Sequence, residues 1–166
     1  MSEEKTKLEN GQSLRDKFGD AGAAIYHLNS YLEQLAELIK EEQPGRPDGA
    51  IQLYFEPCGK GCSGCPHPRW GTWFQNRKYW NAPKEKRGVE VPYGLRRKVK
   101  DSPRKSRAYQ ASKNSLENDL LAGRIDQAME VIEKRKTLLD ALRGITISVN
   151  AARNLGERLV GEKPSW

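Results

Sequence analysis

Four side chains able to bind a metal fall within ten residues of one another: Cys58, Cys62, Cys65 and His67. Thiolate sulfur and imidazole nitrogen are the donors that zinc prefers. Four of them complete a tetrahedral shell with no position left for a reactive water. The pattern therefore predicts one zinc ion per chain with a structural role.

The identity of the fourth ligand in this shell is open to alternatives. His67 follows Cys65 by only two residues, which strains the usual loop geometry around zinc. If His67 does not bind, the fourth ligand is His27, a residue of a second chain, or water. The competing interpretation of the segment from Cys58 to His67 is a glycine-rich loop that carries three free thiols and no metal. We favour a metal, because so many glycines are costly to order unless something rigidifies them.

Positive charge is concentrated after the cysteines. Residues 84 to 107 carry ten Lys/Arg against three Asp/Glu, and this excess equals the net charge of +7 of the whole chain. Such blocks mark either contacts with polyanions or a solvated loop. The residues that we expect to bind nucleic acid are Lys60, Arg69, Arg77, Lys78, Tyr79, Trp80, Arg96, Arg97, Lys98, Lys100, Arg104, Lys105 and Arg107.

Aromatic residues cluster in the same part of the chain and allow two interpretations. They are Tyr54, Phe55, Trp70, Trp73, Phe74, Tyr79, Trp80 and Tyr93. Beside cations they are able to stack on unpaired bases, or they form a small core that covers the zinc. We assign Phe55 and Trp73 to the core, and keep Tyr79 and Trp80 as candidates for stacking because they follow two cations.

The first element that must position these residues is a helix over about 14–42. Ser13 and Asp16 resemble a capping box. The apolar stripe recurs every three or four residues as Phe18, Ala21, Ile25, Leu28, Leu32, Leu35 and Ile39. The prolines and glycines of residues 44–49 end this helix.

The remaining elements are two strands and a second helix. Residues 50–55 and 70–77 are rich in β-branched and aromatic residues and flank the cysteines, and residues 88–91 are a weaker candidate for an edge strand. A helical pattern resumes over about 112–160, with an interruption expected at Gly123. The fold class is thus mainly α with a small β zinc module.

We expect the two long helices to be antiparallel and joined by a zinc-clipped hairpin and a basic segment. Residues 13–160 then form one domain, with a zinc and aromatic module at 46–82 and the basic segment at 84–111. Residues 1–12 are expected to be a flexible N-terminus and 161–166 a tail. Dimerisation would bury the helical stripes further.

The segment from Leu53 to Lys60, with its Cys-Gly-Lys step, resembles an uncharacterised prokaryotic and phage family. In that family a Cys-Gly-Lys step, a cysteine cluster, a histidine and an aromatic strand lie between helical segments. The aromatic run from Trp70 to Phe74 carries the rest of the likeness, so the motif covers about 53–80. The resemblance implies zinc and a phage or mobile-element origin.

The sequence favours a binding protein over an enzyme. It contains no phosphate-binding Gly-rich loop, no zinc-protease motif and no deaminase motif, and its two histidines leave few general bases. We expect a regulatory or accessory protein that binds DNA or RNA. The alternative is a phage or plasmid adaptor that binds a host protein. No run is long enough to cross a membrane, so we expect a soluble, cytoplasmic protein.

Overall fold

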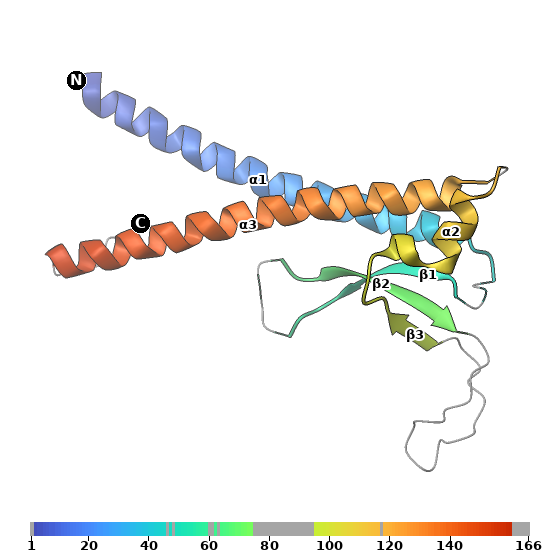
Figure 1. Cartoon of the computed structure of the whole chain (residues 1–166). Coiled ribbons are helices and arrows are strands. Elements are labelled where there is room, and N and C mark those ends of the chain that lie inside the picture. Colours follow the sequence, from blue (N-terminus) through green and yellow to red (C-terminus); the bar gives the residue numbers. More distant parts are fainter. Residues whose placement is uncertain are drawn as a thin grey trace, which may run out of the picture. The chain divides into compact units, whose positions relative to one another are not determined.

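The computed structural model describes residues 2–45, 47, 49–59, 62, 64–74, 95–116 and 118–160 (Figure 1). The chain divides into two compact units. One is Asn29–Ile132, and the other combines Met1–Leu28 with Glu133–Trp166. In chain order the elements are α1 (Ser2–Glu41), β1 (Ile51–Glu56), β2 (His67–Phe74), β3 (Leu95–Lys98), the 3-10 helix η2 (Pro103–Lys105), α2 (Arg107–Lys113) and α3 (Leu120–Val160).

Helix α1 is longer than its sequence pattern predicts. It begins at Ser2, so Ser13 lies inside the helix and does not cap it, and residues 2 to 12 belong to α1 rather than to a separate N-terminal segment. Along the predicted stripe, Leu32, Leu35 and Ile39 are buried, whereas Phe18 is 42% exposed. Burial therefore increases along α1 toward its C-terminal end.

The strands form one antiparallel sheet in the order β1-β2-β3 (Figure 1). In the β1-β2 pair, Ile51 lies opposite Thr72 and Glu56 opposite His67. In the β2-β3 pair, Gly71 lies opposite Lys98. Strand β3 is formed by residues that we predicted to be part of the basic segment. The weaker strand candidate at 88–91 lies outside the described residues.

The C-terminal end of α1 is joined to β1 by the side chain of Gln43. Its Nε2 donates to the carbonyls of Ile39 and Ile51 at 2.8 Å each, and its Oε1 accepts from the amide of Ile51 at 2.8 Å. One buried amide thus satisfies a carbonyl of the last helical turn and both backbone groups at the start of the strand.

The helix predicted over 112–160 corresponds to α3, and a separate helix, α2, precedes it and begins at Arg107 within the predicted basic segment. The break lies at residues 114–119 and not at Gly123, whose amide bonds the carbonyl of Asp119 inside the first turn of α3. Ser112 explains the position, because its Oγ donates to the carbonyl of Asn118 and accepts from the amide of Ala122. A side chain that pairs with backbone groups ends a helix more effectively than one glycine.

The apolar core belongs to the unit Asn29–Ile132. Every buried hydrophobic residue of the described chain lies between residues 32 and 131. Ile51 and Leu53 of β1 are 1% and 2% exposed, and Tyr109 of α2 and Ile125 of α3 are buried in the same unit. The sheet therefore buries the face that carries Ile51 and Leu53.

In the other unit, the described side chains of α1 and α3 are more exposed. Tyr26, Ile147 and Leu155 are 69%, 62% and 49% exposed. None of the described helices has an apolar stretch of the length that crossing a bilayer requires.

Candidate metal centre

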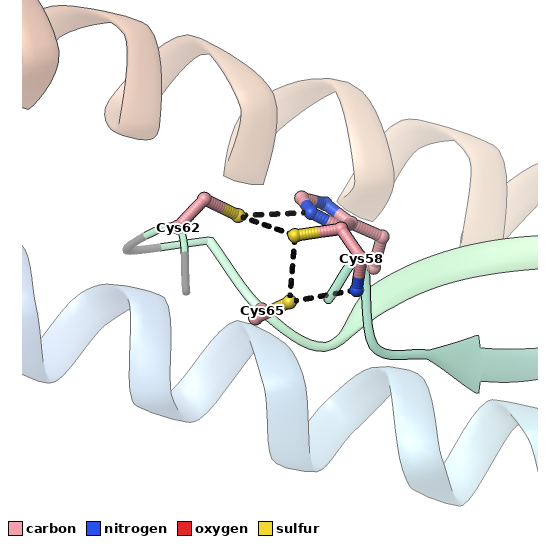
Figure 2. Close-up of side chains that lie close together, drawn as sticks. Cys58, Cys62 and Cys65 are labelled. Carbon is pink, nitrogen blue, oxygen red and sulfur yellow. Dashed lines mark hydrogen bonds between the residues drawn. The ribbon is translucent and has the colours of Figure 1, made fainter. Parts of the chain in front are cut away.

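The structure brings all four predicted ligands together. The ligand atoms of Cys58, Cys62, Cys65 and His67 lie within 4.8 Å of one another. Cys58 Sγ is 3.4 Å from Cys62 Sγ and 3.3 Å from Cys65 Sγ, and His67 Nε2 is 3.0 Å from Cys62 Sγ. Figure 2 shows the three cysteine side chains pointing toward one another. These are the distances of a cluster, since a disulfide would hold two sulfurs at about 2.05 Å.

The β1-β2 pairing explains how one loop supplies the whole cluster. Cys58 comes two residues after the end of β1, and His67 is the first residue of β2. Because Glu56 and His67 are cross-strand partners, the two ends of the loop are already close. Gly59 adopts a φ of 69°, a conformation that favours glycine, and this allows the chain to turn directly after Cys58.

The arrangement fits a tetrahedral metal ion. Metal–sulfur bonds of about 2.3 Å place two ligand sulfurs about 3.8 Å apart, close to the separations in the cluster. The amide of Cys58 donates to Cys65 Sγ at 3.1 Å, as an amide does to a metal-bound thiolate. All four residues are half-buried, so water has limited access.

The local electrostatics favour a cation. The Cys58 amide lowers the pKa of Cys65, but the Cys58 side-chain contact, burial and the Cys62 contact outweigh it, so the pKa of Cys65 is raised. The neighbouring thiols therefore oppose the ionisation of Cys65. A bound metal ion removes this cost, because it neutralises the thiolates that it binds.

His27 takes no part in the cluster. It lies in the unit that contains residues 1–28, and its ring packs edge-on against Tyr26 at 5.9 Å between centroids. Of the fourth-ligand alternatives within the chain, the geometry favours His67.

Two predicted nucleic-acid contacts lie beside the metal loop on the sheet. Arg69 Nε and Lys98 Nζ are each 3.8 Å from Glu56 Oε2, and all three side chains are between 43% and 55% exposed. Glu56 was absent from our predicted site. Its position beside these two cations follows from the strand register, which a single sequence does not reveal.

Other predicted cations lie on the segment that follows β3. Lys100, Lys105 and Arg107 are exposed, and Lys105 Nζ is 4.0 Å from Asp101. Arg104 differs, because its Nε bonds Asp126 of α3 at 2.6 Å. That contact raises the pKa of Arg104 and fixes the guanidinium to the scaffold.

Asp126 also accepts from the Tyr109 hydroxyl at 3.1 and 3.2 Å. This carboxylate holds both η2 and α2 against α3, and we did not predict it. Arg96 and Arg97 occupy backbone positions of β3, opposite Trp73 and Thr72. The predicted residues Lys60, Arg77, Lys78, Tyr79 and Trp80 lie outside the described residues.

Comparisons with protein-family models, curated proteins and solved structures gave no match.

Proposed function

We propose that the chain binds one structural zinc ion through Cys58, Cys62, Cys65 and His67 and uses the adjoining basic sheet to bind nucleic acid. Three thiolates and an imidazole favour zinc over magnesium and calcium, which prefer oxygen ligands. A complete protein shell supports a structural role, and the proposal is of a binding protein and not an enzyme.

One observation carries the nucleic-acid proposal: part of the basic block is a strand of the sheet that the metal loop organises. Strand β3 pairs with β2, and β2 begins at the metal ligand His67. A solvated loop would leave the spacing of Arg96, Arg97 and Lys98 undefined. A strand instead repeats its cations at fixed intervals, which suits a phosphate backbone.

In this proposal α1 and α3 are an antiparallel scaffold for the zinc-clipped β1-β2 hairpin. The protein then acts as a regulatory or accessory factor, and its resemblance to the phage family implies a phage or mobile-element origin.

The zinc part is tested by metal analysis of the purified chain. We expect about one zinc per chain, and Cys62→Ser should lower this content while the helical signal in circular dichroism remains. Full zinc retention by Cys62→Ser would contradict the assigned shell.

The nucleic-acid part is tested by salt dependence. Arg96, Arg97, Lys98 and Lys100 are replaced together by glutamine. The slope of log affinity for duplex DNA against log salt should flatten by about one unit for each phosphate that the variant no longer neutralises. The matched control replaces four exposed cations of the long helices, Lys17, Lys134, Lys136 and Arg158. The control should keep the slope. Absence of salt-sensitive binding by the wild type to DNA and RNA would overturn the proposal.

A second candidate function is an adaptor that binds a host protein or a second copy of the chain. It is favoured by the exposed apolar side chains of α1 and α3, of which Tyr26 and Ile147 are more than 60% exposed. Pull-down from host lysate with and without nuclease separates the two. A stoichiometric protein that survives nuclease supports the adaptor, whereas loss of all partners supports nucleic-acid binding.

A further inference from the structure

Two of the three cysteines face each other across the β1-β2 hairpin. In the strand register Glu56 is the partner of His67, and the same register extended by two residues brings Cys58 opposite Cys65. The side chains agree with this placement (Figure 2). The two sulfurs are 3.3 Å apart, and the amide of Cys58 donates to Cys65 Sγ at 3.1 Å. We call Cys58 and Cys65 the facing pair.

The positions of the facing pair suit a disulfide. Facing residues of antiparallel chains have Cα atoms about 4.5 to 5.5 Å apart, and a disulfide bridges Cα atoms about 4.4 to 6.8 Å apart. The two sulfurs are not bonded, since 3.3 Å separates them and a disulfide bond measures about 2.05 Å. The register of the strands would not have to change for them to join.

Cys62 has a different position. It lies within the loop between the two strands, and its sulfur is 3.0 Å from His67 Nε2 as well as 3.4 Å from Cys58 Sγ. A disulfide within the facing pair would leave Cys62 and His67 as the two remaining ligands of the cluster. Structural zinc sites use four ligands, so these two are not enough to retain the ion.

A small oxidant is able to reach the cysteines. All three are half-buried, unlike the side chains of the apolar core. The thiolate is the form of cysteine that reacts with peroxides, and a bound metal ion keeps its cysteine ligands in that form. The facing pair therefore combines access, reactivity and a partner for each sulfur.

We propose that the facing pair is an oxidation site, where hydrogen peroxide joins Cys58 to Cys65 and the chain loses its zinc. This inference rests on the proposed zinc site and adds its regulation. One thiolate attacks the peroxide, the O–O bond breaks, and a sulfenic acid and hydroxide form. The second thiolate then attacks that sulfur and displaces a second hydroxide. Two protons convert both hydroxides to water, and the two sulfurs together give up two electrons to the peroxide.

The test treats the full, zinc-loaded chain with hydrogen peroxide and follows zinc release with a chromophoric chelator. We expect release of about one zinc per chain. The thiols counted after denaturation should fall from three to one, because the disulfide uses two of the three cysteines. Peptide mass spectrometry should find Cys58 joined to Cys65 and Cys62 still a thiol. Dithiothreitol should then restore zinc binding, since a disulfide is reducible.

Cys62→His and Cys65→His form a matched pair of variants. Each keeps two cysteines and two histidines, a ligand set that binds structural zinc. Cys62→His retains the facing pair and should release zinc on oxidation as fast as the wild type. Cys65→His lacks it and should release zinc roughly tenfold more slowly, because its two cysteines do not face each other. If either variant does not bind zinc, the peptide map of the wild type decides alone.

The outcomes separate this inference from the proposed function. A disulfide that includes Cys62, oxidation to sulfinic acid with no disulfide, or zinc retained with all three thiols intact overturns the inference. The zinc site of the proposed function stands in each of these cases. If the freshly purified, reduced chain contains no zinc and takes up none, the proposed zinc site fails, and this inference with it.

Discussion

At the scale of single residues, the two histidines form a natural pair of test and control. His67 Nε2 lies 3.0 Å from Cys62 Sγ, whereas the His27 ring packs on Tyr26. We expect His67→Gln to lower zinc affinity by at least tenfold, because it removes one of four ligands. His27→Gln should leave the affinity unchanged. Competition with a chromophoric chelator measures both, and equal behaviour of the two variants would argue against His67 as a ligand.

The cysteine environment makes metal affinity depend on pH. Zinc binds thiolates, so each thiol that is protonated in the metal-free protein releases a proton on binding. Affinity must then rise as pH rises. Because the pKa of Cys65 is raised, this rise should continue above the pH at which an ordinary thiol ionises. Chelator competition at several values from about pH 6 to pH 10 tests this expectation. A flat profile would contradict it.

Gln43 is a residue whose role is purely structural. Gln43→Ala leaves three buried backbone groups without a partner, at Ile39 and Ile51. We expect a loss of about 2 kcal/mol or more in the free energy of unfolding. Gln127→Ala, at an exposed position of α3, is the matched control and should cost less than about 0.5 kcal/mol. Urea denaturation gives both values, and similar losses would refute the role assigned to Gln43.

At the scale of elements, the metal ligands and the long helices could be predicted from the sequence, for a shared physical reason. Both depend on short spacings: the ligands fall in one loop, and a helical stripe repeats every three or four residues. Strand β3 could not be predicted, because its residues appear as a block of charge. Its partner β2 ends at Phe74, twenty-one positions before Leu95.

The roles of Asp126 and Glu56 could not be predicted either, because they depend on residues that are distant in the sequence. Asp126 gains its role by meeting Arg104 and Tyr109 across η2, α2 and α3, and Glu56 gains its role from the sheet register. Neither has a local pattern that distinguishes it from other surface carboxylates. The predicted break at Gly123 was wrong for a related reason, since the side chain of Ser112 decides where the helix ends.

At the scale of the whole molecule, the core lies in the unit Asn29–Ile132, together with the metal cluster. Removing zinc with a strong chelator should therefore loosen β1 and β2 while most helical signal remains, because the helices do not contain ligands. Hydrogen exchange should show faster exchange in Ile51–Glu56 and His67–Phe74 than in α3. Unchanged protection of both strands after complete zinc removal would show that the metal does not support the sheet.

Among the strands of the described residues, β3 lies at an edge of the sheet, with β2 on one side. An edge strand exposes unpaired backbone groups that another chain is able to join, and lysine or arginine along it keeps a second strand away by charge repulsion. Arg96, Arg97 and Lys98 thus have a second consequence, which is resistance to aggregation. A chain in which they are neutral should scatter more light on concentration or warming, even in a buffer that contains no nucleic acid.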